Sequence, residues 1–300
     1  MLKDILPDFI FNEIKKYNYE FLQEIHLRVN DKPVLLYNSK NILLDNFSTK
    51  VITSSLLENI VLKIANNSIY TVQNQLKKGY LCLNNGVRIG ISGNFSEENF
   101  NLKNIQGLNI RLPHQIFNCS KLIFDDLFYK NTPLNTLIIS PPGAGKTTII
   151  RDILYQFNFI DEIFNITIVD DRNELCAMYN GVSTLKTYCH ADIITNISKE
   201  QAILFSVKNL NPDIIVTDEI TSPSDVLAIE KSINLGIKII ASIHATDLND
   251  IITKKEFSSF IKNKHFDRYI ILSKRDGVGN ITGFYDKNFK KIPIYLYNPS

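Results

Sequence analysis

Cysteine is scarce in this sequence. Only four of its 300 residues are cysteines, at positions 82, 119, 176 and 189, and no two of them are spaced as Cys-x-x-Cys. Without such pairs, reduced thiols are favoured over a disulfide framework or a zinc site. Cys189 and His190 are adjacent and would supply half of a metal site, but the sequence offers no second half. We therefore expect no metal bound through cysteine.

An excess of one charge is also missing. Lys and Arg together number 33 and Asp and Glu 31, which leaves a formal net charge of +2. A net charge this small does not attract nucleic acid or anionic lipid to the molecule as a whole, so either partner would need a local patch of positive charge. Asp4, Pro7 and Asp8 interrupt the start of the chain, and we expect no signal peptide. No apolar run approaches the roughly 18 residues of a membrane-spanning helix, and we expect no such helix.

The composition is that of a globular chain, with 44% hydrophobic and 21% charged residues. Its length corresponds to one large or two ordinary domains. A polar stretch with a proline, residues 129–133, separates two kinds of pattern. We therefore predict an N-terminal α+β domain over residues 1–132 and a second domain over 133–300.

In the first domain, a hairpin is predicted from two segments joined by a turn that contains a proline. Polar and apolar residues alternate over 24–29, and residues 34–37 are an apolar run. Apolar residues at helical spacing over 56–64 follow Ser54 and Ser55, which can cap a helix. A second hairpin is predicted from strands 80–83 and 87–91, joined through Asn84-Asn85-Gly86, because Asn-Gly supplies the positive φ angles of a tight turn.

The second domain alternates strands with helices. Short apolar, β-branched segments at 136–140, 166–170, 213–218 and 238–244 are typical of strands buried on both faces of a parallel sheet. Helical segments at 146–157, 199–210 and 224–235 lie between them. The alternation predicts a doubly wound α/β core with right-handed crossovers.

The strongest motif follows the first of these strands and opens the next helix, which is the context of a phosphate-binding loop. It consists of Ser140, Pro141, Pro142, Gly143, Ala144, Gly145, Lys146, Thr147 and Thr148. The glycines let backbone N–H groups turn toward phosphates, Lys146 reaches the β and γ phosphates, and Thr147 offers a hydroxyl to Mg²⁺. Ser140 replaces the usual first glycine but removes no ligand. The motif predicts a site for ATP with Mg²⁺.

The strand over 213–218 ends in two carboxylates, Asp218 and Glu219. Beside a phosphate-binding loop, the first is expected to serve Mg²⁺ and the second to act as general base for the attacking water. A solvated acidic turn is the alternative.

Two other strand ends carry candidate catalytic residues. The segment from Asp170 to Glu174 puts more carboxylates at the same edge, and Asp171 or Glu174 could position water or hold Arg172. A solvated loop with a weak Asp–Arg pair explains the same pattern. His244 ends the strand over 238–244, where a γ-phosphate sensor would lie, although a histidine there can also be an ordinary edge residue.

Arginines occur in the polar phase of the N-terminal strands, at positions 28, 88 and 111. A solvated strand face is the default interpretation. P-loop enzymes nevertheless need an arginine near the γ-phosphate, and a neighbouring subunit can supply it. Arg111 is the first candidate for that role.

These motifs together resemble the stage III sporulation protein AA family over nearly the whole chain. The matching segments are Glu24 to Arg28, Gly79 to Leu81, Arg88 to Gly90, Asn109 to Arg111, Pro141 to Thr148, Val169 to Glu174, Asn211 to Asp213 and Asp218-Glu219. That family is similar to the ring-forming ATPases of type II and type IV secretion systems.

The resemblance implies a RecA-like P-loop NTPase core with a parallel sheet, behind the smaller α+β domain. It implies an ATPase that forms a homohexamer and energises or gates a channel complex between mother cell and forespore. The expected partners are membrane channel proteins of that complex and not nucleic acid. The expected location is cytoplasmic, peripheral at the mother-cell-side forespore membrane.

The sequence departs from the family pattern at two places. Asp171 stands where glutamate is expected, and Thr221-Ser222 follows Glu219 where Gly-Arg is expected. The predicted ATPase domain therefore lacks one arginine that the family pattern leads us to expect.

Two other functions fit the motifs: a scaffold that binds ATP as a switch with little turnover, and a RecA-like nucleic-acid motor. The second needs a basic stripe with aromatics, and only Lys254-Lys255 and the segment 262–264 are basic clusters.

Overall fold

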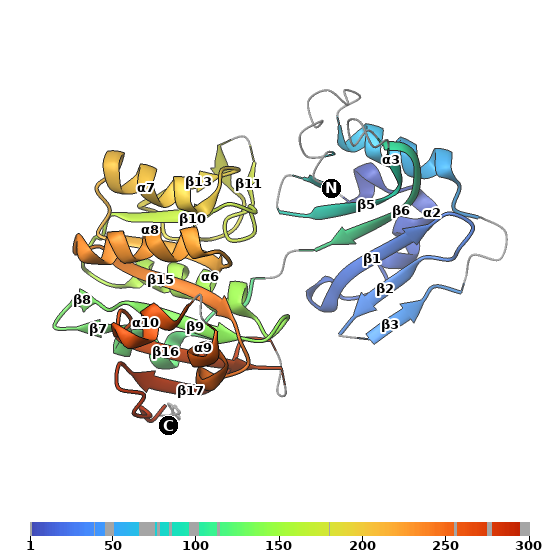
Figure 1. Ribbon diagram of the computed structural model, residues 1–300. Helices are drawn as coiled ribbons and strands as arrows, with labels where there is room; N and C mark the ends of the chain where they lie inside the picture. The colour runs from blue at the N-terminus through green and yellow to red at the C-terminus, as the bar shows by residue number, and fades with distance from the viewer. Residues whose placement is uncertain are drawn as a thin grey trace. The chain divides into compact units, whose positions relative to one another are not determined.

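The chain forms two compact units, residues 1–114 with 177–184 and residues 115–176 with 185–300 (Figure 1). The computed structural model describes residues 2–38, 40–45, 51–65, 76, 79–83, 86–95, 102–112, 115–179, 181–254, 257–274 and 278–294. Each unit has its own sheet and its own buried core.

The division between the units falls before residue 115 rather than after residue 132. Residues 115–132 belong to the second unit because they are tied to its first long helix, α6 (Lys146–Gln156). The buried carboxylate of Asp152 in α6 accepts hydrogen bonds from the backbone N–H groups of Asn118 at 2.8 Å and Ser120 at 2.7 Å. The polar, proline-containing stretch near residue 130 contains a small strand pair, β7 (Phe128–Tyr129) with β8 (Thr132–Pro133), and is not the boundary between the units.

The first unit contains an antiparallel sheet of six strands in the order β3-β2-β1-β6-β5-β4. The strands are β1 (Leu22–Arg28), β2 (Val34–Tyr37), β3 (Lys40–Leu43), β4 (Tyr80–Cys82), β5 (Arg88–Phe95) and β6 (Leu102–Arg111). Both predicted hairpin pairings are confirmed, β1 with β2 and β4 with β5. The turn residues Asn84 and Asn85 lie outside the described residues.

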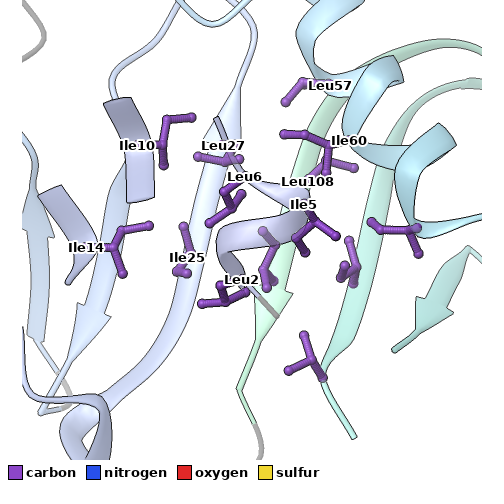
Figure 2. Close-up of a cluster of buried hydrophobic side chains, with 14 of the residues drawn as sticks. Leu2, Ile5, Leu6, Ile10, Ile14, Ile25, Leu27, Leu57, Ile60 and Leu108 are labelled. Carbon is purple, nitrogen blue, oxygen red and sulfur yellow. The ribbon is translucent and has the colours of Figure 1, made fainter. Parts of the chain in front are cut away.

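Helices α1 (Leu2–Ile5), α2 (Asp8–Ile14) and α3 (Ser54–Ile64) bury their apolar side chains against this sheet. Figure 2 shows Ile5, Ile10 and Ile60 from the helices among Ile25 and Leu27 of β1. The predicted helix over 56–64 is present as α3. Its cap is Thr53, whose hydroxyl accepts a hydrogen bond from Leu56 N at 3.2 Å, and not Ser54 or Ser55.

The second unit contains a sheet of seven strands in the order β13-β10-β14-β15-β9-β16-β17. All pairings are parallel except the last, between β16 and β17. Its members are β9 (Thr136–Ser140), β10 (Ile166–Asp170), β13 (Ala191–Thr195), β14 (Ile214–Ile220), β15 (Lys238–His244), β16 (Arg268–Ser273) and β17 (Asn280–Asp286). The four predicted strands, β10, β14, β15 and β9, are neighbours in the middle of this sheet. The predicted parallel α/β core is therefore confirmed.

Helices cover both faces of this sheet (Figure 1). Buried residues of α7 (Lys199–Asn209) and α8 (Pro223–Asn234) share a core with one face, which includes Leu137 and Ile139 of β9. Ile138 points to the opposite face because side chains alternate along a strand, and α6 packs there against β9, β14 and β15. No helix of the described residues is long and apolar enough to cross a membrane.

Candidate functional site

The phosphate-binding loop predicted from the sequence joins β9 to α6, as expected. Gly143 and Gly145 have φ angles of +70° and +101°, which few other residues adopt without strain. Gly145 is the N-cap of α6, and no side chain of the described residues caps this helix end. The first N–H groups of a helix lack acceptors within the helix and carry the positive end of its dipole. The loop therefore offers backbone donors to an anion.

Two residues next to the ends of β16 and β17, Lys274 and Gly279, lie against this loop. The backbone N–H of Gly279 donates to the carbonyl of Ala144 at 2.9 Å. A Cβ atom added at Gly145 would lie 2.3 Å from Gly279 N, so the two backbones approach too closely for any side chain there. A Cβ added at Gly143 would lie 3.6 Å from Nζ of Lys274. These residues, which the sequence pattern did not single out, bring a further lysine to the phosphate-binding loop.

Replacing Gly145 by Ala should destabilise the second unit more than replacing Gly236 by Ala. Both glycines have positive φ, +101° and +90°, so alanine is strained at either by about 1–3 kcal/mol. Only at Gly145 does the new Cβ also overlap another backbone, because nothing lies within 4 Å of the Cβ position at Gly236. Thermal unfolding of both variants measures the difference, and equal losses of Tm would contradict the close approach to Gly279.

Glu219, the predicted general base, faces the lysine of the loop. Nζ of Lys146 lies 3.4 Å from Oε2 of Glu219, and both side chains are mostly buried. Glu219 is held on β14, which is separated from β9 only by β15. The structure thus brings together the two residues to which phosphate binding and water activation were assigned.

Asp218, the predicted Mg²⁺ residue, is paired with a lysine that the sequence analysis did not select. Nζ of Lys199 lies 2.5 Å from Oδ1 of Asp218, 2.6 Å from the carbonyl oxygen of Glu219 and 3.3 Å from Oδ1 of Asp171. The Lys199 side chain is only 4% exposed. The two acidic strand ends therefore meet at one buried ammonium group.

Burial raises the pKa of the Asp218 carboxyl to about 7, against the opposing effect of the Lys199 ammonium. The nearby charges of Asp171 and Asp170 also contribute to this raised pKa. Because desolvation disfavours the charged form, the Lys199 ammonium offsets part of the cost of ionising Asp218. A divalent cation at this carboxylate would have the same electrostatic effect.

Asp170 has a structural role in the second acidic segment. Its carboxylate accepts hydrogen bonds from the backbone N–H groups of Glu174 at 2.7 Å and of Leu175 and Cys176, each at 2.9 Å. Arg151 of α6 donates to the carbonyl oxygens of Leu175 and Glu174. Asp170 thus shapes the turn after β10, and Arg151 ties that turn to the helix of the phosphate-binding loop.

The remaining candidates lie in different surroundings. Asp171 forms an ion pair with Lys199, which favours neither a solvated loop nor an Asp171–Arg172 pair for this residue. His244 is the register partner of Ser140 on the neighbouring strand, which places it at the start of the loop. Thr147 and Thr148 are half-buried in the first turn of α6. The backbone of Glu174 is positioned by Asp170 and Arg151.

The three arginines lie in the first unit, on the strands where they were predicted. Nε of Arg111 on β6 forms an ion pair with Oε1 of Glu24 at 3.1 Å, and its side chain is 59% exposed. The guanidinium of Arg88 on β5 lies 4.1 Å from the centre of the Tyr80 ring, and Arg28 at the end of β1 is exposed. A role of any of them at the nucleotide stays a prediction.

No group of three or more His, Cys, Asp or Glu side chains in the described part of the chain is arranged to hold a metal ion by itself. Two of the oxygen donors present are the Thr147 hydroxyl in the loop helix and the Asp218 carboxylate, next to Glu219 on β14. Both are of the kind that Mg²⁺ prefers, and Mg²⁺ usually takes few protein ligands together with phosphates. The donor set suits a metal that arrives with a nucleotide.

Comparison with solved structures confirms the fold. The pilus retraction motor PilT, solved with bound ADP, is 14% identical with a TM-score of 0.61, over 92% of this chain and 81% of that one. The ATPase DotB of Legionella pneumophila is 12% identical with a TM-score of 0.59, over 89% and 76% of the two chains. At this identity the likeness shows the fold alone, which is the RecA-like α/β core of secretion ATPases.

Comparison of sequences shows the family. Stage III sporulation protein AA of Bacillus subtilis is 27% identical over 96% of this chain and 95% of its own length. The uncharacterized protein ycf45 of Cyanidium caldarium is also 27% identical, over 81% of this chain and 68% of its own length. The profile of one family, described as sporulation stage III, protein AA, matches residues 7–292. The chain therefore belongs to the sporulation stage III protein AA family.

Proposed function

We propose that this chain binds ATP with Mg²⁺ and hydrolyses it, as the motor or gate of a membrane channel complex during endospore formation. The observation that carries the proposal is the Lys146–Glu219 pair at 3.4 Å, beside a helix N-terminus that no described side chain caps. A phosphate cradle alone would support binding. The adjacent carboxylate adds the group that water activation requires.

The residues fit a nucleotide with its metal ion. The backbone donors of residues 143–147 and the ammonium of Lys146 would hold the phosphates, and Thr147 and Asp218 would serve Mg²⁺. A bound Mg²⁺ neutralises charge that develops on the phosphates. The related fold of PilT carries ADP, which supports nucleotide binding here.

The family and the fold support the remaining parts of the proposal. A curated relative over nearly the full length is a stage III sporulation protein, and the structural neighbours are ATPases of secretion and pilus systems. We infer a homohexamer that works with membrane channel proteins at the mother-cell-side forespore membrane, from its cytoplasmic face. The mass of the protein in solution, with and without a non-hydrolysable ATP analogue, tests the hexamer.

Replacing Lys146 by Ala should weaken ATP binding about 10- to 100-fold, because a charge-assisted hydrogen bond contributes about 1.5–3 kcal/mol. The measurement is calorimetric titration with a non-hydrolysable analogue. Lys208→Ala is the matched control, since Lys208 is an exposed lysine of the same unit on α7. Equal affinities of the two variants would reject the phosphate-binding assignment.

A further inference from the structure

Lys199 occupies a position that is unfavourable for a lysine in two respects. Its side chain is 4% exposed, although an ammonium group loses much hydration free energy on burial. It is also the first residue of α7, after the N-cap Ser198, where the helix dipole disfavours positive charge. Interactions with the surrounding oxygens must offset both costs.

Two of those interactions are hydrogen bonds of the ammonium group, to Oδ1 of Asp218 at 2.5 Å and to the carbonyl oxygen of Glu219 at 2.6 Å. The third is an ion pair with Oδ1 of Asp171 at 3.3 Å. Asp171 follows β10, whereas Asp218 and Glu219 lie on β14. One side chain from α7 therefore joins the ends of two neighbouring strands and holds the backbone of the proposed base.

Lys146 and Lys199 contact different acidic groups of the two strand ends. Lys146 contacts the side chain of Glu219, while Lys199 contacts its carbonyl oxygen and the carboxylates of Asp218 and Asp171. Lys146 belongs to the loop, so a nucleotide would engage it directly. Lys199 directs its two hydrogen bonds and its ion pair with Asp171 to the strand ends.

We propose that Lys199 is a positioning residue for hydrolysis, which fixes the direction of Glu219 by tying Asp171, Asp218 and the Glu219 backbone to α7. The proposal rests on the proposed ATPase function. It also gives Asp171 a role: Asp171 acts through Lys199 and does not itself touch the reacting water. The two residues then form one functional unit, and their effects depend on each other.

The experiment compares Lys199→Met, Lys199→Arg, Asp171→Asn and the double variant Lys199→Met/Asp171→Asn with the wild type. Lys208→Met on the exposed side of α7 is the matched control. Three quantities are measured: analogue affinity by calorimetry, kcat and KM for ATP, and Tm of the nucleotide-free protein. The last of these does not depend on activity.

Lys199→Met should lower kcat about 10- to 100-fold, which is the usual loss when a supporting partner of a functional group is removed. KM and analogue affinity should change little, in contrast to Lys146→Ala. Lys199→Arg should retain more of the rate than Lys199→Met, because the charge remains but a planar guanidinium cannot meet all three oxygens equally. Lys208→Met should match the wild type.

The double variant tests whether the residues act together. If Asp171 acts through Lys199, the losses of kcat and of Tm in the double variant should be smaller than the combined losses of the single variants. Additive losses of kcat would overturn the proposal and make Asp171 a direct participant. An unchanged kcat in folded Lys199→Met, or a loss of affinity as large as in Lys146→Ala, would also overturn it.

The proposal can still be tested if Lys199→Met does not fold or if the wild type does not hydrolyse ATP. If Lys199→Met does not fold, Lys199→Arg and Asp171→Asn carry the test, and an unchanged kcat in both would reject the positioning role. If the wild type binds ATP but shows no hydrolysis, the proposed function fails, whereas non-additive Tm values in the nucleotide-free protein would still support the tie between Lys199 and Asp171.

Discussion

Glu219→Gln should bind ATP normally and hydrolyse it about 10²- to 10⁴-fold more slowly than the wild type, the usual loss on removal of a general base. Glutamine preserves the size of the side chain but cannot accept a proton at neutral pH. In the structure, Glu219 lies 3.4 Å from Lys146 and is 27% exposed, so it is close to the loop and still accessible to water. Phosphate release under multiple turnover gives kcat, and calorimetry gives the affinity.

Glu174→Gln is the matched control for this prediction, because Glu174 belongs to the other acidic strand end. Its backbone is fixed by Asp170 and Arg151. Normal hydrolysis by Glu219→Gln together with slow hydrolysis by Glu174→Gln or Asp171→Asn would place the base in the second acidic segment. Slow hydrolysis by the wild type itself, with tight binding, would favour the nucleotide-gated scaffold over the motor.

Asp218→Asn should act differently from Glu219→Gln and raise the Mg²⁺ concentration needed for half-maximal activity. A neutral amide is a poorer partner for a hard cation than a carboxylate. The change also leaves the buried ammonium of Lys199 with one anionic partner fewer. The same Mg²⁺ requirement in this variant and the wild type would remove Asp218 from the metal site.

The sequence predicted the parts of the fold whose pattern is local. The four central strands of the second unit are almost continuously apolar, and each is a strand of the parallel sheet as predicted. The loop from Ser140 to Thr148 is recognisable because its glycines, lysine and threonines are contiguous. The edge strand β13 escaped prediction because its mixed sequence, with Asp192 exposed, resembles a loop.

What the sequence could not predict are the contacts between distant segments. Lys199 lies 19 and 28 positions from Asp218 and Asp171, and no spacing rule links a residue of α7 to strand ends. The tie of Gly279 to Ala144 depends on where the β16–β17 segment lies in the folded unit. One local signal was available, since a lysine directly after an N-cap opposes the helix dipole. Such a residue is worth inspecting for an acidic partner.

The burial of Asp152 is another feature that the sequence could not predict. An aspartate within a helix is expected to be exposed, yet this side chain is fully buried and accepts hydrogen bonds from residues 118 and 120. The hydroxyl of Ser120 donates to the same carboxylate at 2.6 Å. These hydrogen bonds attach the segment that follows the first unit to the helix of the phosphate-binding loop. That segment therefore belongs to the second unit, and the boundary between the units lies before residue 115, not at the polar stretch that the composition indicated.

Arg111→Ala should bind nucleotide through its own loop but hydrolyse it about 10³-fold more slowly, if the arginine acts as a finger on the transition-state charge. The second unit has Thr221-Ser222 where the family pattern leads us to expect Gly-Arg, and we predict that Arg111 takes the role of that arginine. Arg111 is exposed on β6, and its Nε forms an ion pair with Oε1 of Glu24 at 3.1 Å. This pairing orients the guanidinium on the surface of its own unit.

Mixing of variants tests whether Arg111 acts between subunits. Arg111→Ala and Lys146→Ala are each expected to be inactive, but in mixed oligomers some interfaces would join an intact loop to an intact arginine. Partial recovery of activity is therefore expected if the finger acts across the interface. No recovery in verified mixed oligomers would reject action in trans. Full activity of Arg111→Ala alone would remove it as the finger, and the same assay would then be applied to Arg88→Ala and Arg28→Ala, since these residues lie on strands of the same sheet.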